Sequence, residues 1–187
     1  MNDTELSPIV RPSRVVVGVT GSASSAAALR RAVFEARRSG SVLVPLLAWE
    51  PPGGEAVYRM NPEPVLAELW EHQAGERLES AILAALGALP ADVHIEPTVV
   101  RAPAVLALNA LADQPTDLLV LGAGSRRPLA RFFHGRVRFR TVAHAQAPVL
   151  LVAPPTPPAL PRSVRRELRR VTPEDFLRPA DRGRSAH

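Results

Sequence analysis

An alternation of short apolar runs with longer helical segments is the feature that most constrains the fold of this chain. The apolar runs are rich in Val and Leu, as is typical of strands buried on both faces of a sheet. We predict strands over residues 14–19, 42–48, 93–100, 117–121 and 148–152. Helices are expected between them, over residues 22–39, 64–86, from 103 onward, and 135–145. This order predicts a single-domain α/β fold, an open parallel five-stranded sheet with helices on both faces.

Local signals mark the ends of the first helix and the buried faces of two helices. Ser22 or Ser24 can cap the start of the first helix, and Gly40 is a good stop signal. Apolar side chains at helical spacing predict which faces are buried. In the first helix these are Leu29, Val33 and Ala36, and in the long helix the stripe is Leu66, Leu69, Gln73, Leu78, Ile82 and Leu86.

Two of the predicted strands contain a proline. Pro45 lies within the second strand and Pro97 within the third. Proline has no N–H to give to a sheet, and inside sheets it is found at edges and bulges. We therefore expect a bulge or a local break at Pro45.

Proline content and charge divide the chain into three parts. Residues 1–12 are polar, and we expect a flexible leader. Residues 13–153 hold the whole alternation of strands and helices. Residues 154–187 begin with PPTPPALP, which cannot form helix or sheet ladders, and they carry eight arginines. We expect this Pro/Arg-rich tail to be disordered.

The composition excludes several classes of chemistry. The chain has no Cys, which removes disulfides and thiolate nucleophiles, and its 23 basic residues are all Arg. Without Lys there is neither a Walker A lysine nor an amine for a Schiff base. No apolar run is long enough to span a membrane, and the first residues do not resemble a signal peptide. We therefore expect a cytoplasmic protein that has no membrane partner.

Catalytic and metal-binding patterns are not found in the sequence. The five histidines are scattered, and none forms the H-x-x-x-H or H-E-x-x-H spacing of a metal site. There is no G-x-S-x-G nucleophile motif, and the acidic residues show no pairing for acid–base catalysis. We predict that the protein is not an enzyme and has no catalytic residue, metal site or firmly assigned cofactor.

Two loops lie where open α/β sheets bind ligands, beyond the carboxyl ends of strands at the point where the strand order reverses. One is Thr20-Gly21-Ser22 after the first strand, and the other begins at Gly122 after the fourth. An interpretation without a ligand is also open. Thr20 and Ser22 would then be a turn and a helix cap, and the glycines would serve only the strand exit and the next helix start.

Four segments, in order, resemble the universal stress protein family. They are VVVGVTGSASSAAALRRA, AWEPP, RAPAVLALNALADQPTDLLVLG and HGRVRFRTVAHAQAPVLLV. The resemblance implies a Rossmann-like sheet of strand order 3-2-1-4-5 and a regulatory role in stress response. It also implies a homodimer through the last strand, which begins at Pro148 and ends at Val152. The sequence supports such a dimer, because that strand would otherwise leave an apolar, unpaired edge.

The resemblance also implies where a nucleotide would bind. Members that bind ATP have an acidic residue after the first strand and the pattern G-x2-G-x9-G-[ST] after the fourth. Gly122, Gly135 and Val137 match this pattern, and Gly21 and Val44 are further candidate contacts. Three positions depart from it: Thr20 replaces the acid, Ser125 the second glycine and Arg136 the final hydroxyl residue. We therefore expect a degenerate nucleotide pocket with weak or no ATP binding.

An arginine cluster surrounds this altered loop. The segment from Arg126 to Arg140 carries six arginines and no acid. Three interpretations remain open: an anion pocket, a nucleic-acid surface with Phe132, Phe133 and Phe139 as stacking faces, or a solvated basic face. We expect a non-enzymatic, dimeric regulator, and we do not expect nucleic acid as its partner. The alternatives are a stress sensor that binds ATP or another adenine nucleotide through an Arg-rich phosphate loop, and a polyanion-binding protein.

Overall fold

The computed structural model describes residues 12–124 and 139–154, all within the first of the two units into which the chain divides, Met1–Pro155. The expectations for the leader, residues 1–12, and for the tail, residues 154–187, concern residues that lie almost entirely outside this described part.

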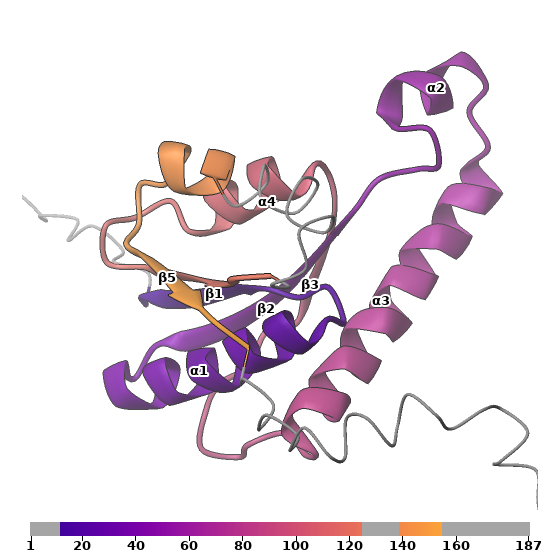
Figure 1. Ribbon diagram of the computed structural model, residues 1–187. Coiled ribbons are helices and arrows are strands. Elements are labelled where there is room, and N and C mark those ends of the chain that lie inside the picture. Colours follow the sequence, from indigo (N-terminus) through magenta and orange to yellow (C-terminus); the bar gives the residue numbers. More distant parts are fainter. Residues whose placement is uncertain (1–11, 125–138, 155–187) are drawn as a thin grey trace, which may run out of the picture. The chain divides into compact units, whose positions relative to one another are not determined.

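Five parallel strands form one sheet, in the order β3-β2-β1-β4-β5 (Figure 1). The strands are β1 (Arg14–Gly18), β2 (Val42–Trp49), β3 (Thr98–Arg101), β4 (Leu118–Gly122) and β5 (Val149–Val152). Val15, Val16 and Val17 of the central strand are at most 1% exposed, as expected of a strand covered on both faces. The predicted fold class and strand order are confirmed.

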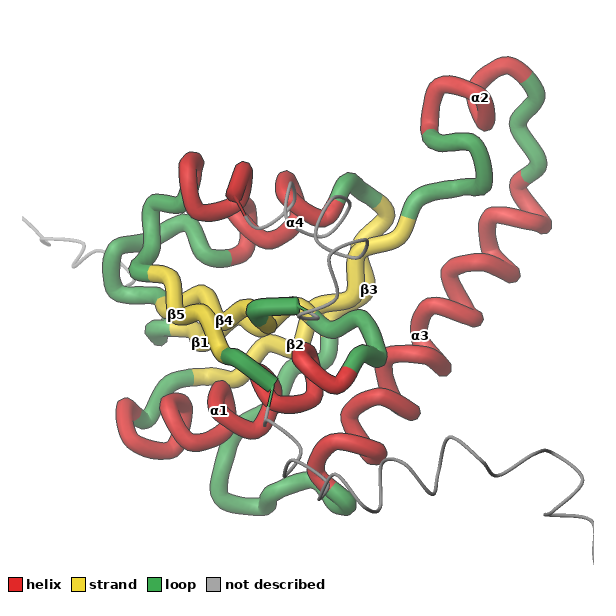
Figure 2. Tube along the Cα trace, viewed as in Figure 1, coloured by secondary structure: helices red, strands yellow, loops and turns green. Residues whose placement is uncertain are grey.

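Helices cover both faces of the sheet, and each face has its own core (Figures 1 and 2). The helices are α1 (Ala23–Ser39), α2 (Glu55–Met60), α3 (Pro64–Leu86) and α4 (Ala104–Leu111), and residues 139–144 are also helical. The core on one face contains α1 and α3, and the core on the other contains α4. Successive residues of β1 alternate between the two cores, as the pleat of a strand requires.

Helix α1 begins and ends where its capping residues predict. The N–H of Ser25 donates to the Ser22 hydroxyl at 3.2 Å, and Gly40 adopts the left-handed conformation, φ 66°, at the C-cap. The predicted face of Leu29, Val33 and Ala36 is buried. These are local signals, so the sequence alone was sufficient to place this helix.

The expected bulge at Pro45 is wrong, whereas the expected local break is found in the pairing of β2 with β3, which is interrupted between the Leu43–Ile95 bridge and the Leu46–Thr98 pair. Strand β2 runs through Pro45 in unbroken register with β1, opposite Val17. On the β3 side, the pairings Leu43–Ile95 and Leu46–Thr98 keep the same offset, so Pro45 lies opposite Pro97. The Pro45 nitrogen cannot donate to the carbonyl of Glu96, and the Thr98 hydroxyl donates to that oxygen instead, at 3.1 Å.

The missing N–H of Pro45 also explains why β3 is shorter than the strand predicted over residues 93–100. With Pro45 unable to donate, the regular ladder begins only at Thr98, and Ile95 makes an isolated bridge to Leu43. The cost of the proline is one backbone hydrogen bond, which a side chain replaces, and not a distortion of the sheet.

Helix α3 has the predicted bounds, but only part of its predicted stripe is buried. Leu78 and Ile82 lie in the core, whereas Leu66 and Leu69 are 42% and 47% exposed. The N-terminal half of α3 extends past the sheet towards α2 (Figure 1), so no strand lies beneath it. Sequence periodicity shows which residues share a helix face but not how far the neighbouring sheet reaches. Helix α2 was not predicted, and none of its six residues is buried.

Asp117, predicted within the fourth strand, lies just before β4 and is 2% exposed. Its carboxylate accepts hydrogen bonds from the backbone N–H groups of Arg14, at 2.9 Å, and Gln114, at 3.1 Å. It thereby joins the start of β1 to the turn before β4, and the backbone donors satisfy a buried polar group.

Candidate functional site

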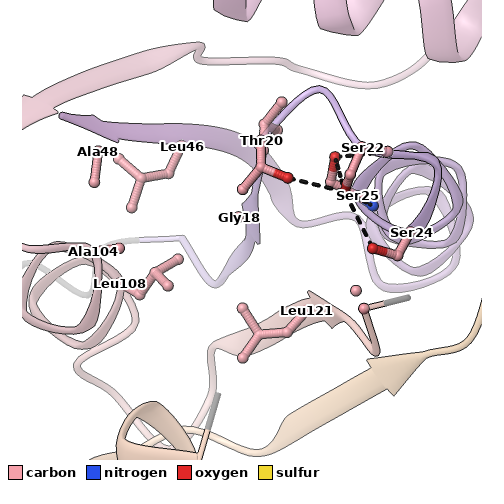
Figure 3. A pocket seen from close by; sticks show the side chains of 13 residues that line it. Gly18, Thr20, Ser22, Ser24, Ser25, Leu46, Ala48, Ala104, Leu108 and Leu121 are labelled. Atoms are coloured by element: carbon pink, nitrogen blue, oxygen red, sulfur yellow. Dashed lines mark hydrogen bonds between the residues drawn. The ribbon is translucent and has the colours of Figure 1, made fainter. Parts of the chain in front are cut away.

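The loops after β1 and β4 meet at the carboxyl edge of the sheet, and a cavity of about 130 Å³ lies between them (Figure 3). Residues from both strands, from β2 and from the starts of α1 and α4 line it. Among the described residues these are Gly18, Val19, Thr20, Ser22, Ser24, Ser25, Leu46, Ala48, Ala104, Leu108, Leu121, Gly122 and Gly124. None of them is charged. The cavity occupies the place where doubly wound sheets bind their ligands.

One side of the cavity is a chain of hydroxyl groups. The Thr20 and Ser22 hydroxyl oxygens are 2.9 Å apart, and those of Ser22 and Ser24 are 3.1 Å apart (Figure 3). Ser25 donates its own hydroxyl proton to the Ser22 carbonyl at 2.9 Å. These groups surround the N-terminus of α1, the positive end of its dipole. They can both donate and accept hydrogen bonds, so this side suits a polar ligand edge.

The opposite side of the cavity is apolar. Leu46 and Ala48 come from β2, Ala104 and Leu108 from α4, and Leu121 from β4 (Figure 3). A mostly apolar hollow with a few polar groups along one side is typical of sites that bind small molecules.

Val44 does not line the cavity, contrary to its place among the candidate contacts. It is 2% exposed within the core on the α4 side of the sheet. Leu46 and Ala48 point to the same face two and four residues further along β2, nearer the carboxyl edge. Val44 lies too deep, and sequence reasoning placed the contact too early in the strand.

Gly122 lines the cavity as predicted, but the structure gives a packing reason for its lack of a side chain. A Cβ at this position would lie 2.6 Å from the Ser24 carbonyl oxygen and 3.0 Å from the Ser25 nitrogen. The end of β4 therefore passes directly against the first turn of α1. The glycine is required by this approach between two backbones, whether or not a phosphate binds nearby.

A separate groove of about 590 Å³ lies on the α3 side of the sheet. Val19, Thr20 and Ala48 line both hollows. Gly21, with φ 72°, turns the chain at the edge of the groove. The residues of α3 that line the groove are Glu76, Arg77, Ser80, Ala81 and Ala84. Thr20 and Gly21 are thus brought together with Arg77.

Sequence reasoning missed Arg77. The helical spacing could have indicated its position. Ala74 and Ala81, about one helical turn before and after Arg77, belong to the face of α3 that packs on the core. A polar residue beside a buried stripe lies at the margin of the packed face, where it can reach a neighbouring groove.

The remaining candidate contacts, Ser125, Gly135, Arg136 and Val137, lie outside the described residues, as does most of the arginine cluster. In the part of the chain that the structure describes, no group of three or more His, Asp or Glu side chains could hold a metal ion. Within that same part, no helix is both long and apolar enough to cross a membrane.

The sequence model of the universal stress protein family matches residues 12–153. The chain belongs to the universal stress protein family. Universal stress protein Rv1996 of Mycobacterium tuberculosis is 33% identical over 159 residues, which cover 81% of this chain and 49% of that protein. The chain spans about half the length of the curated relatives it matches.

Solved structures of universal stress proteins share the fold. UspA from Lactobacillus plantarum, at 21% identity and a TM-score of 0.53, covers 76% of this chain and 99% of its own. A universal stress protein in complex with cAMP is 27% identical, with a TM-score of 0.48, over 78% of this chain and all of its own. The likeness to UspA shows that the described residues share its fold, and the parallel strand order agrees with it.

Proposed function

We propose that this universal stress protein is a non-enzymatic regulator that acts as a homodimer and binds a small ligand at the carboxyl edge of its sheet. The observation that carries the proposal is the uncharged cavity between the loops of β1 and β4, hydroxyl-lined on one side and aliphatic on the other. Such a lining can hold a ring by shape and hydrogen bonds. Among the described lining residues there is no nucleophile with an adjacent base, which supports a binding role over a catalytic one.

Tight ATP binding is not expected from this pocket. Sites for drug-sized ligands occupy roughly 300–1,000 Å³, whereas this cavity of about 130 Å³ has room for one ring system. Thr20 also offers a hydroxyl where the ATP-binding relatives have a carboxylate. The pocket therefore supports a degenerate site in which ATP is not the preferred ligand.

Calorimetric titration with Mg-ATP tests this. We expect no site with a Kd below about 10 µM, which corresponds to about 7 kcal/mol. The matched variant combines Thr20→Asp, Ser125→Gly and Arg136→Ser, which restores the pattern of the ATP-binding relatives, and we expect it to gain affinity. A Kd below that limit for the unmodified chain would contradict the proposal of a degenerate site.

The proposed dimer uses the outer edge of β5, the last strand of the sheet in the described part of the chain. Leu151 is 51% exposed on this edge strand, whereas Leu150 packs against the core on the α1 side of the sheet. Leu151 is therefore the side chain available to a partner, and Leu151→Arg is the variant that should separate the protomers.

Sedimentation of the purified chain at tens of micromolar distinguishes a dimer from a 20.1 kDa monomer. We expect a dimer, and we expect Leu151→Arg to be monomeric. Leu83→Arg is the control, because Leu83 is equally exposed, at 54%, but lies on α3. A monomeric unmodified chain, or equal effects of both variants, would refute a dimer through β5.

A further inference from the structure

A further hollow, which we call the tryptophan hollow, lies between the end of β2 and the middle of α3. Its volume is about 560 Å³, within the range of roughly 300–1,000 Å³ that is usual for small-molecule sites. Its lining includes Trp49, Glu50, Trp70, Gln73, Glu76 and Arg77. Both tryptophans pack with the core on the α3 side of the sheet, whereas the leucines that line the cavity belong to the core on the α4 side. The tryptophan hollow is therefore a site separate from the cavity.

The aromatic side chains beside this hollow already hold one cation. The Arg101 guanidinium lies 5.5 Å from the ring centroid of Trp49 and 4.2 Å from that of Tyr58. It also donates hydrogen bonds to the Glu55 carboxylate, at 3.1 and 3.2 Å. Tyr58 in turn meets Trp70 edge-on, with ring centroids 6.3 Å apart. An aromatic ring combined with a carboxylate is thus the arrangement by which this part of the molecule holds a positive charge.

Trp70 and Glu50 bring the same two kinds of group to the tryptophan hollow. The Glu50 carboxylate forms no ion pair or hydrogen bond within the described part of the chain. The other carboxylate of the lining, that of Glu76, lies 3.4 Å from His72 Nε2 on the same helix. A positively charged group of a ligand can therefore contact the Trp70 ring and the Glu50 carboxylate, in the way that Arg101 contacts its own aromatic and acidic neighbours.

Arg77 brings the opposite charge to the same hollow. Its Nε donates to the Gln73 carbonyl, one turn earlier in α3, at 3.1 Å, so the guanidinium is folded back along the helix in the direction of Trp70. It forms no ion pair with a carboxylate of the described residues, and its remaining N–H groups form a planar fork that matches a carboxylate. Glu50 and Arg77 thus line one hollow as unlike charges that do not pair with each other. A ligand that carries both charges can contact both side chains at once.

We propose that the tryptophan hollow binds a small zwitterion, with an alkylated ammonium group against Trp70 and Glu50 and a carboxylate against Arg77. An alkylated ammonium is favoured because it keeps its charge while its alkyl groups pack on the indole ring. A ligand with only one charge leaves either Glu50 or Arg77 without a partner. This inference does not depend on ligand binding in the cavity, because the two sites lie on different sides of the sheet.

Tryptophan fluorescence of the full chain tests the proposal, because the chain has two tryptophans and both line this hollow. The probes are γ-butyrobetaine, which carries both charges, choline, which carries only the trimethylammonium group, and butyrate, which carries only the carboxylate. We expect a saturable change of emission with γ-butyrobetaine and an affinity at least about fivefold higher than for choline or butyrate, which corresponds to about 1 kcal/mol. Sodium chloride at the same ionic strength is the control for a general salt effect.

Two substitutions assign the two charges. Arg77→Gln should lower the affinity for γ-butyrobetaine to that for choline and leave choline binding unchanged. Glu50→Gln should weaken the binding of both and leave butyrate binding unchanged. The matched controls are Arg59→Gln and Glu79→Gln, because both side chains are exposed and neither lines the hollow.

Several outcomes would overturn the inference. It fails if γ-butyrobetaine causes no saturable change of emission up to about 50 mM, or if it binds no more tightly than choline. It also fails if the control substitutions weaken binding as much as Arg77→Gln and Glu50→Gln do, because surface charge in general would then explain the binding. Thermal unfolding of each variant shows whether the fold is retained. If Arg77→Gln does not fold, the comparison of the three probes on the unmodified chain and on Glu50→Gln still decides.

Discussion

Replacing Gly122 by alanine tests the contact that closes one side of the cavity. The added Cβ would lie 2.6 Å from the Ser24 carbonyl oxygen and 2.7 Å from its carbonyl carbon. Ordinary contacts of this kind begin near 3.4 Å, so β4 and the first turn of α1 must separate by roughly 0.8 Å. Both partners are backbone, and neither can move away by changing a rotamer.

The expected loss of stability follows from two opposing terms. Forcing extra volume into a packed site costs about 1–3 kcal/mol, and two rigid backbones place this case in the upper part of that range. Replacing glycine by alanine also restricts the unfolded chain, which returns about 0.4–1 kcal/mol where the backbone conformation is compatible. We expect Gly122→Ala to lower the free energy of unfolding by about 2 kcal/mol.

Two other glycines provide matched controls. At Gly18 a Cβ would lie 3.4 Å from the nearest atom, a terminal carbon of Leu121, so Gly18→Ala should change stability by less than about 0.5 kcal/mol. At Gly75, inside α3, a Cβ meets nothing within 4 Å, and alanine should stabilise the helix by about 0.5–1 kcal/mol.

Urea unfolding of the three variants measures these differences directly. The expected order of stability is Gly75→Ala, then Gly18→Ala, then Gly122→Ala. The reasoning is refuted if Gly122→Ala is as stable as Gly18→Ala, because the end of β4 could then not be pressed against α1 as the structure has it.

Two further predictions concern charged side chains. Glu35 is 4% exposed, and hydrogen bonds from Arg38 and then Arg31 hold its pKa below the usual value of 4.5, against the effect of burial. Its contribution to stability is therefore present at neutral pH and is lost as the pH falls through the lowered pKa. Glu35→Gln should destabilise the protein more at pH 7 than at pH 3, and equal losses in urea unfolding at both pH values would contradict this. The Arg101 guanidinium lies 4.2 Å from the Tyr58 ring centroid and 3.1 Å from Glu55, and it holds α2, which buries no residue of its own. Arg101→Ala should speed hydrogen exchange over residues 55–60 by about tenfold and leave α1 unchanged, whereas exchange rates like those of the unmodified chain would show that α2 is held in another way.

The sequence predicted well those features that depend on neighbouring residues. Ser22 and Gly40 act within one helical turn, and the apolar runs of the strands need only to be buried, so the helix caps and the parallel sheet were accessible from the residues. The strand order came from the resemblance to the family. Thr20, Gly21 and Gly122 lie at the carboxyl edge of the sheet, where their positions after the predicted strands place them.

Features that depend on distant contacts were not accessible. Strand β2 stays continuous at Pro45 through its register with β1, and the carbonyl that Pro45 leaves without a donor is bonded by the Thr98 hydroxyl, more than fifty residues later. Arg77 reaches the groove only because α3 crosses beside the β1 loop, and the tight position of Gly122 depends on how closely α1 approaches β4. Each of these is set by the packing of elements, which periodicity and motifs do not specify.

Because of Pro97, the β3 edge of the sheet offers fewer backbone N–H donors to another chain than the β5 edge does. In β3 the even-numbered residues bond to β2, as Ala102 does to Trp49, so the odd-numbered residues face outward, and Pro97 has no donor to offer there. In β5 the carbonyls of Pro148 and Val152 accept hydrogen bonds from β4. The backbone N–H groups of Val149 and Leu151 therefore point away from β4, towards the outer edge. Head-to-tail joining of β3 to β5 would repeat without end and form a filament. A proline on the β3 edge would obstruct that growth. The dimer proposed above, with β5 joined to β5 about a twofold axis, would use up the other edge and end the assembly at two chains.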